Sequence, residues 1–498
     1  SWVTDAISTS GPSRAPSTAA ATAAAVQRMT AVWHHGYREP MMRLEGPDAA
    51  FIAGETPEWH FHVTALMVLD PAGGEGWSFE RLRDNCDARI HQSPQFRWKL
   101  HEDPTGFSRP WMADDPEFDI DNHINRIAVA PPGTDADLTD LVGTLIAEKL
   151  DRSRPLWEAW VIEGLEGGRV GMLTKVHHAI IDGASGADLA TVLMDMEANP
   201  DPDPEPPPYE PEPLPTAWER TTGGIGQVLE YPVKFARLGW QAVDMGRSLV
   251  KGFLDDAAPS QPFSAPRTPF NGRLTSERSL AWQSLPMAEV TRIKEAFGVK
   301  TNDVVLAIVG GTLRRYLEEL DALPDKPLVA QVPVSMRTDA TREKVGTQVA
   351  AMFTSLATDV DDTATRLQTI AAETLKAKAM RREFDRAHQA NITESVTPAV
   401  IRTAARMWTA AGLDERTPPV FNLIVSNVAG PQFELYMAGA RLEAMYPLGP
   451  LLYGSGVNAT VISNADRLDV GFLACPDLVP DVWSIAAHVE PALAELSE

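Results

Sequence analysis

The sequence predicts an α/β fold built from two similar domains that are joined by an extended linker. Strand and helix patterns mix along the chain without a regular βαβ repeat, which indicates a mixed α/β architecture. Residues 199–215, NPDPDPEPPPYEPEPLP, are too rich in proline and acid to form a hydrogen-bonded ladder or to bury apolar area, so we interpret them as the linker. The 498 residues, 44% of them hydrophobic, suffice for two or more cores.

The order of apolar patterns gives the expected elements on each side of the linker. Before it, strand patterns lie at 60–69, 126–130 and 170–176, and a helical pattern lies at 137–150. After it, we expect the following elements in chain order: a long helix at about 216–257, a proline-containing loop at 258–272, an apolar helix at 303–320, strands at 328–334 and 349–356, helices at 361–386 and 395–411, strands at 421–426, 457–463 and 468–473, and a helix after Pro480. The predicted domains are therefore 39–198 and 273–498, with 199–272 as linker and helical crossover and 1–38 as a poorly ordered tail.

Composition and charge exclude several classes of protein. A net charge of −24 opposes nucleic-acid binding because a polyphosphate would be repelled, so any anionic ligand must meet local basic groups. Two cysteines rule out a disulfide framework and fit a reducing compartment. No apolar run reaches the length of about eighteen residues that a membrane span needs, and the N-terminal segment does not have the pattern of a secretory signal. We expect an enzyme of the cytoplasm.

Residues 177–183, His-His-Ala-Ile-Ile-Asp-Gly, are the most informative motif in the chain. They lie between a strand pattern and a helical pattern, so His177 and His178 are expected in the turn that joins the two. Gly183 permits the positive φ of a tight turn, and we interpret Asp182 as a brace for the loop. Imidazole titrates near pH 6.5, so a neutral His178 could take the proton from an attacking hydroxyl at neutral pH.

Other interpretations of the two histidines stay open. They could be polar residues that are satisfied at a buried turn, or metal ligands. The metal alternative is weaker because His-Glu-x-x-His is absent and Cys86 and Cys475 lie far apart in sequence. A serine hydrolase would need Gly-x-Ser-x-Gly, which does not occur. We therefore expect no metal.

The His-His-x-x-x-Asp-Gly string resembles the active-site motif shared by acyl-CoA-dependent acyltransferases of the chloramphenicol-acetyltransferase-like fold and by peptide-synthetase condensation domains. Further segments resemble the bacterial wax ester synthase/diacylglycerol acyltransferases, and most closely the actinobacterial triacylglycerol synthases. These segments are PLW at 155–157, VIEG at 161–164, NG at 271–272, TNDVVLA at 301–307, PVSMR at 333–337 and SNVAGP at 426–431. The resemblance spans roughly residues 40 to 495.

The resemblance implies two chloramphenicol-acetyltransferase-like domains with the histidine pair at their interface, reached by acyl-CoA from one side and by an acceptor alcohol from the other. The implied activity is transfer of a long-chain acyl group to diacylglycerol, to a long-chain alcohol, or to both, with acyl-CoA as substrate and no cofactor. His178 would be the general base and Asp182 its structural partner, with Asn302 and Asp303 near the same interface. The chain departs from the family pattern at Thr64, Thr347 and Ala429, which leaves acceptor preference open.

The chemistry itself can be derived from the groups involved. A thioester is already activated, so the alcohol can attack directly while His178 removes its proton, and no acyl-enzyme is required. Asn302 or a nearby backbone amide would stabilise the oxyanion, although asparagine at a helix start is just as often an N-cap. The phosphates of CoA need cations, and the candidates are Arg314, Arg315, Arg337, Arg342 and Lys344, together with Lys376, Lys378, Arg381, Arg382 and Arg386 of a predicted helix.

Two further hypotheses concern lipid. The chain could instead be a condensation-like or degenerate acyltransferase that serves as a lipid-binding module, although the intact motif argues against this. Apolar residues recur at helical spacing over 229–254, and the opposite face carries Lys234, Arg237, Arg247 and Lys251. This predicts a helix that lies on an anionic lipid surface, at the inner membrane or a lipid droplet, and the alternative is a helix packed across the two domains.

Overall fold

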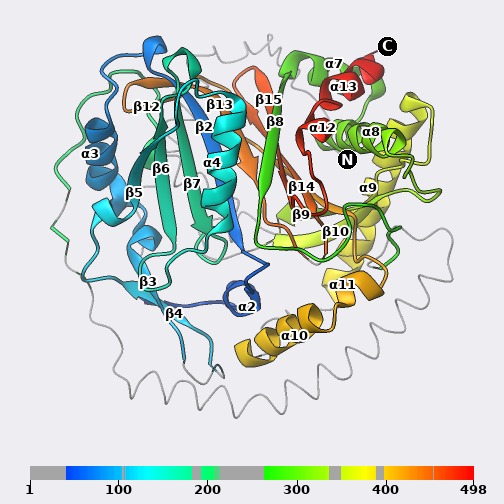
Figure 1. Cartoon of the computed structure of the whole chain (residues 1–498), viewed down its shortest axis with the longest axis horizontal. Coiled ribbons are helices and arrows are strands. Elements are labelled where there is room, and N and C mark those ends of the chain that lie inside the picture. The colour runs from blue at the N-terminus through cyan, green and yellow to red at the C-terminus, as the bar shows by residue number, and fades with distance from the viewer. Residues whose placement is uncertain are drawn as a thin grey trace, which may run out of the picture. The chain divides into compact units, whose positions relative to one another are not determined.

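Two six-stranded mixed β-sheets form the framework of the chain (Figure 1). The computed structural model describes residues 41–103, 106, 108–181, 192–206, 208–209, 211, 263–335, 349–387, 397–452 and 454–497. The first sheet has the strand order β12 (Tyr436–Met437), β13 (Ala440–Leu448), β2 (His62–Asp70), β7 (Val170–His177), β6 (Trp157–Glu163) and β5 (Ile124–Ala128). The second has the order β10 (Val349–Ser355), β9 (Val329–Ser335), β11 (Leu423–Val428), β14 (Val457–Asn464), β15 (Arg467–Ala474) and β8 (Ser279–Pro286). A small sheet of β1 (Met41–Arg43), β4 (Trp111–Asp114) and β3 (Trp98–His101) completes the set.

Helices pack on these sheets. Among the residues that the structure describes, the helices before the linker are α2 (Gly46–Gly54), α3 (Phe79–Arg89) and α4 (Asp135–Ala147). Those after it are α7 (Met287–Phe297), α8 (Thr301–Glu319), α9 (Thr363–Ala387), α10 (Pro398–Ala410), α11 (Leu413–Arg416), α12 (Trp483–Ala486) and α13 (Val489–Ser497). Among the described residues, no single helix is long and apolar enough to cross a membrane. Helices α7 and α8 have sufficient length and apolar character only when taken together, and the chain bends by 107° between them.

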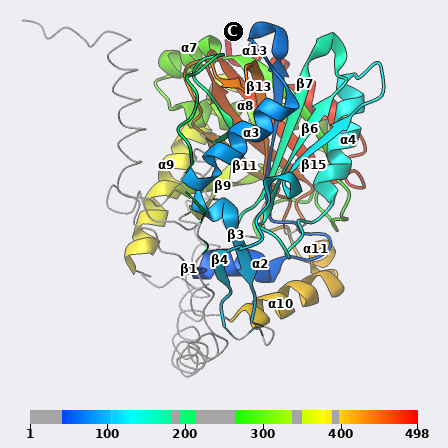
Figure 2. The same cartoon turned by 90° about the vertical axis from the view of Figure 1, so that its left-hand side faces the viewer.

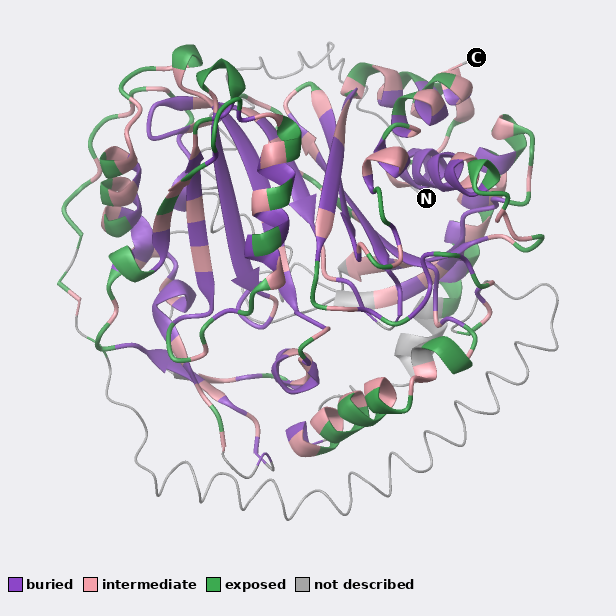
Figure 3. Cartoon of the chain, viewed as in Figure 1, coloured by how far each residue is buried: buried purple, intermediate pink, exposed green. Residues whose placement is uncertain are grey.

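The central strands β2 and β7 are buried on both faces, which explains their nearly continuous apolar runs. Successive side chains of a strand point to opposite faces, and β2 divides accordingly between two cores. Met67 and Leu69 pack in the core that contains α3, whereas Leu66 and Val68 pack in the core that contains α4. Figure 2 shows α3 and α4 on opposite faces of this sheet, and Figure 3 shows its central strands β2 and β7 mostly buried.

A strand from the second half of the chain completes the first sheet. β13 pairs antiparallel with β2, with Met445 opposite Met67. Asp469 on β15 of the second sheet is fully buried and accepts hydrogen bonds from the Met445 amide at 2.9 Å and from the Ser284 hydroxyl. The two sheets are thus joined by buried polar contacts as well as by apolar packing.

Most of the predicted elements are confirmed by the structure. The helix expected at 303–320 is α8, which is buried on nearly every side in the core of the second sheet, and the strands expected at 60–69 and 170–176 are β2 and β7. The described elements that were not predicted are the strands β1, β3, β4, β6, β8, β12 and β13 and the helices α2, α3, α7 and α11. In β13, for example, Arg441, Glu443 and Pro447 interrupt the apolar pattern. The helix expected at 216–257 lies outside the described residues.

The domain division at 39–198 and 273–498 stays a prediction. The pairing of β13 with β2 shows that one element of the later segment belongs to the sheet of the earlier one.

Helix α4 approaches the second sheet closely at one glycine. A Cβ atom at Gly143 would lie 2.5 Å from the carbonyl oxygen of Arg278, the residue before β8. A backbone carbonyl cannot swing aside as the end of a flexible side chain can, so the contact requires glycine at this position.

We therefore predict that Gly143→Ala destabilises the protein by about 1–3 kcal/mol through overpacking, although alanine is the better helix former. The measurement is the urea midpoint of unfolding. Thr144→Ala, at an exposed position of the same helix, is the control and should change stability by no more than about 0.5 kcal/mol. A Gly143→Ala protein as stable as the wild type would contradict the close packing.

Candidate active site

The motif histidines lie at the end of β7, in a turn that is held on both sides. His177 is the last residue of β7 and pairs in register with His62 of β2. Its amide donates to the carbonyl of Leu156, in the PLW segment, at 2.9 Å. The amide of His178 donates to the carbonyl of Phe61 at 2.7 Å. The chain direction at His178 is therefore set by the two neighbouring segments.

The His177 ring itself closes this turn. Its Nδ1 atom accepts a hydrogen bond from the Ala179 amide at 3.0 Å. A ring nitrogen that accepts carries no proton, so the neutral imidazole of His177 has its proton on Nε2. That atom faces Oε1 of Glu55 at 3.9 Å. His177 thus fixes the backbone on both sides of His178.

Glu55, directly after α2, is a buried carboxylate with cations on one side and imidazoles on the other. Its side chain is 4% exposed. Arg152 contacts Oε2 at 2.7 Å, whereas Oε1 lies 3.5 Å from Nε2 of His62. Burial alone raises the pKa of Glu55, but the contact with His62 and the charges around it, including those of Lys149 and Arg152, outweigh burial and hold the pKa below its ordinary value. The carboxylate is therefore ionised at neutral pH.

The histidines around Glu55 are held neutral. Burial is the largest cause and lowers the pKa of His177 and that of His60 to about 3, and it also lowers the pKa of His62. These imidazoles can accept or donate hydrogen bonds at neutral pH, but they carry no charge. They are poorly suited to exchange protons with a substrate, because each is almost fully enclosed.

His178 differs from these three histidines in its exposure. It is only half-buried, whereas His60, His62 and His177 are each no more than 6% exposed. Its ring packs against Phe51 of α2, with ring centroids 4.4 Å apart, and Phe51 in turn packs against Phe61 at 5.2 Å. Within the histidine cluster, His178 is therefore the most exposed imidazole.

A buried lysine supports the same strand. Lys175, two residues before His177, is fully buried, and its ammonium donates to the carbonyls of Leu145 and Glu148 near the end of α4 at 2.8 and 3.0 Å. Glu158 on β6 supplies the counter-charge at 2.6 Å. A cation at a helix C-terminus is electrostatically favourable, so Lys175 ties α4 to the strand that carries the histidines.

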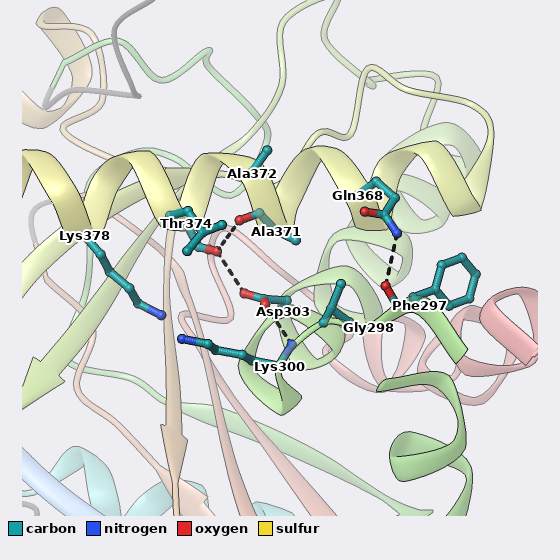
Figure 4. A pocket seen from close by; sticks show the side chains of 11 residues that line it. Phe297, Gly298, Lys300, Asp303, Gln368, Ala371, Ala372, Thr374 and Lys378 are labelled. Atoms are coloured by element: carbon teal, nitrogen blue, oxygen red, sulfur yellow. Dashed lines mark hydrogen bonds between the residues drawn. The ribbon is translucent and has the colours of Figure 1, made fainter. Parts of the chain in front are cut away.

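The structure places Asn302 in the first turn of α8, where none of the described residues hydrogen bonds to its side chain. The neighbouring Asp303 is buried and has a structural function, accepting from the Lys300 amide at 3.0 Å and from the Thr374 hydroxyl of α9 at 2.8 Å. Figure 4 shows these bonds beside a cavity of about 280 Å³, toward which Lys300 and Lys378 extend. Asn302 does not line that cavity.

The candidate phosphate-binding arginines on α8 have acidic partners. Arg314 pairs with Asp361 at 2.6 Å and with Glu318 at 2.7 Å, and Arg315 pairs with Glu495. On α9, Lys376 pairs with Glu373 at 2.9 Å. Asp182, Gly183, Arg337, Arg342 and Lys344 lie outside the described residues, as do the side chains of Arg381, Arg382 and Arg386. The predicted roles of all these residues stay predictions.

Sequence reasoning missed the residues that surround the histidine pair. Glu55, Arg152 and Lys175 lie outside the motif, and no spacing relates them to it. His60 and His62 gave a usable signal, since the strand predicted at 60–69 would place residues two apart on one face.

The neutral state of His177 predicts a pH dependence of stability. An unfolded histidine titrates near 6.5, whereas folded His177 stays neutral down to about pH 3. The unfolded chain therefore binds the proton first, so stability is complete above pH 6.5 and falls by up to about 1.4 kcal/mol per pH unit below it. His177→Asn keeps an oxygen that can accept from Ala179 but cannot titrate, so its urea midpoint should fall less than that of the wild type between pH 6.5 and 5. His91→Asn, outside the cluster, is the control, and equal slopes for the wild type and His177→Asn would contradict the buried neutral state.

Comparisons with known proteins identify the family. Residues 44–305 match the family model of the wax ester synthase/diacylglycerol acyltransferase catalytic domain, and residues 345–497 match that of the WS/DGAT C-terminal domain. A Mycobacterium tuberculosis protein provisionally named diacylglycerol O-acyltransferase is 37% identical over 468 residues, covering 92% of this chain and 90% of that protein. The structure of the wax ester synthase/diacylglycerol acyltransferase from Marinobacter aquaeolei VT8 superposes with a TM-score of 0.66 at 27% identity, covering 91% of this chain and 98% of that one.

The fold is shared more widely. The starter condensation domain of rhizomide synthetase, solved with C8-CoA, superposes with a TM-score of 0.52 at 13% identity, covering 92% of this chain and 94% of that one. The α/β fold with two chloramphenicol-acetyltransferase-like domains is thus confirmed. With both family models matched in order along the chain, this protein belongs to the wax ester synthase/diacylglycerol acyltransferase family and is an acyl-CoA-dependent acyltransferase.

Proposed function

We propose that the protein transfers a long-chain fatty acyl group from acyl-CoA to diacylglycerol, and also to long-chain alcohols, with His178 as the general base. The observation that carries the proposal is the contrast in exposure within the histidine cluster: His178 is half-buried, while His60, His62 and His177 are enclosed. The names of the relatives support diacylglycerol as an acceptor, and the name of the Marinobacter protein supports both acceptors.

The proposed reaction is a direct transfer between the two substrates. The hydroxyl oxygen of the acceptor attacks the thioester carbonyl carbon as His178 takes the hydroxyl proton. Collapse of the tetrahedral intermediate breaks the C–S bond, and the imidazolium returns the proton to the CoA thiolate. No residue is acylated, and no cofactor is needed because the thioester supplies the driving force.

The surroundings of His178 support this assignment. A general base must keep its position while its charge changes, and the backbone bonds from His178 to Phe61 and from Ala179 to the His177 ring hold the turn in place. The aromatic contact with Phe51 shields one part of the ring from water. We propose that Asp182 braces the following loop and that Asn302 or a backbone amide near it stabilises the oxyanion.

We further propose that the protein meets its water-insoluble acceptor at an anionic lipid surface, peripherally at the inner membrane or a lipid droplet. The support comes from the sequence: residues 229–254 combine an apolar helical stripe with Lys234, Arg237, Arg247 and Lys251 in a chain whose net charge is −24. A helix that only packed between domains would explain the apolar stripe but not this local reversal of charge.

The first test of the proposed function is His178→Ala. Thiol release from palmitoyl-CoA in the presence of dioleoylglycerol or hexadecanol should fall by at least about a hundredfold, since general base catalysis typically contributes 10²–10⁴, with an unchanged circular dichroism spectrum. His177→Ala should be less damaging, because that ring positions the turn and does not reach the substrate. Full activity of His178→Ala, or a stoichiometric acyl adduct on the wild type by intact mass, would contradict direct transfer. If the wild type binds palmitoyl-CoA but releases no thiol, with or without an acceptor, the protein is a lipid-binding module instead.

The second test concerns the lipid surface. The wild type should co-sediment with phosphatidylglycerol vesicles in a salt-sensitive manner. Changing Lys234, Arg237, Arg247 and Lys251 together to Glu should abolish this binding while activity on a detergent-dispersed short-chain alcohol is retained. Unchanged vesicle binding would leave the segment as a packing helix.

A further inference from the structure

A second site of interest is a basic cavity of about 210 Å³ between α2, α10 and the segment that follows α4. Figure 1 shows α2 and α10 side by side, and the helices contact each other. The ionisable side chains that line the cavity are four cations, Lys149, Arg152, Arg402 and Arg406, and two carboxylates, Glu55 and Glu102. The lining therefore carries an excess of two positive charges in a chain whose net charge is −24.

Both carboxylates in this cavity are already bound. Arg152 contacts Glu55 at 2.7 Å with one terminal nitrogen and Glu102 at 3.1 Å with the other, and Lys149 lies 3.7 Å from Glu55. Arg402 and Arg406, by contrast, form no ion pair with any residue that the structure describes. The excess charge of the cavity is therefore located on these two arginines.

The two arginines are placed to act together. They are four residues apart on α10, so their side chains leave the helix on the same face. The start of α10 is fixed by the Thr397 hydroxyl, which accepts from the Val400 amide, and by a backbone bond from Ala399 to Gly106 at 2.9 Å. Two planar guanidinium groups on one rigid face match the oxygens of a phosphate, which accepts paired hydrogen bonds.

The cavity also borders the active site. Glu55 is one of its walls, and the same carboxylate faces His62 at 3.5 Å and His177 at 3.9 Å. A volume of about 210 Å³ accommodates a phosphate group with several waters, since one water occupies about 30 Å³ of liquid. A carboxylate ligand would also be attracted, but with only two oxygen atoms it would accept fewer hydrogen bonds from the two guanidinium groups than a phosphate group would.

Arg402 and Arg406 have no ion-pair partner among the described residues, the cavity carries excess positive charge, and it shares a wall with the active site. From these observations we infer that this cavity binds a phosphate group. Two sources supply that chemistry: the phosphates of CoA, in which case the inference rests on the proposed function, and the headgroup of an anionic phospholipid. Arg402 and Arg406 would bind the phosphate oxygens, while Arg152 stays on Glu55 and Glu102.

The experiment is isothermal titration calorimetry of the full chain with three ligands: CoA, dephospho-CoA, which lacks only the 3′-phosphate, and monomeric dihexanoylphosphatidic acid. The test variant is Arg402→Gln with Arg406→Gln. The control is Arg273→Gln with Arg416→Gln, two exposed arginines that do not line the cavity. Circular dichroism verifies that both variants are folded.

We expect the test variant to bind one of the phosphate ligands at least about tenfold more weakly, as the loss of charge-assisted hydrogen bonds would cause, and the control to bind like the wild type. Weaker binding of CoA identifies the substrate as the source, and equal binding of dephospho-CoA by the wild type and the test variant then assigns the 3′-phosphate. Weaker binding of phosphatidic acid alone identifies the lipid headgroup. If the test variant binds both CoA and phosphatidic acid as the wild type does, the inference is wrong. The proposed function is judged separately, by the turnover of His178→Ala.

Discussion

The pairing of β2 with β7 is the constraint on which the site depends. The register places His62 opposite His177, and a shift of one residue would turn every side chain of the strand to the other face. Both faces of these strands are buried, so such a shift would expose two cores at once. The same register places the Phe61 carbonyl where it accepts the amide of His178 at 2.7 Å. Apolar burial on both faces of the strands therefore fixes the register, and the register fixes the position of the polar turn at the end of β7.

Electrostatics then separates the histidines by function. Enclosing several imidazoles near one carboxylate is costly if any of them is charged, because burial disfavours ions. The structure avoids this cost in two ways. His60, His62 and His177 stay neutral. The negative charge of Glu55 is balanced by Arg152 and Lys149. His178 alone among the four is not fully enclosed. The enclosed histidines serve as a neutral, hydrogen-bonding scaffold for it.

The second half of the chain contributes to this scaffold from a distance in sequence. β13 lies against β2 on the side opposite β7, and Asp469 of the second sheet accepts from the backbone of β13. Helix α10 closes over α2, the helix that carries Phe51 toward His178 and ends beside Glu55. A reaction site held by elements of both halves suits a two-substrate transfer, because each substrate can be positioned by a different part of the fold.

By itself, the sequence determined the class of fold, and it supplied the hypothesis that His178 is the base. The histidine motif, bounded by a strand pattern and a helical pattern, sufficed to predict His178 as the base, and strong apolar periodicity sufficed for β2, β7 and α8, because burial on a regular element repeats with a fixed period. Strands such as β13, with charged residues on a partly exposed face, could not be predicted, since their stability comes from partners distant in sequence.

Only the tertiary structure decided what surrounds His178. Glu55, Arg152 and Lys175 come from segments up to 120 positions apart, from residue 55 to residue 175, and no local rule links them. Arg402 and Arg406 likewise look like ordinary charges on a helix until α10 packs against α2. Charge interactions depend on distance and burial, which the linear sequence does not contain. Glu55 therefore connects the histidines to Arg152, and the two arginines line a basic cavity, only after folding has removed water and brought these groups within a few ångströms of one another.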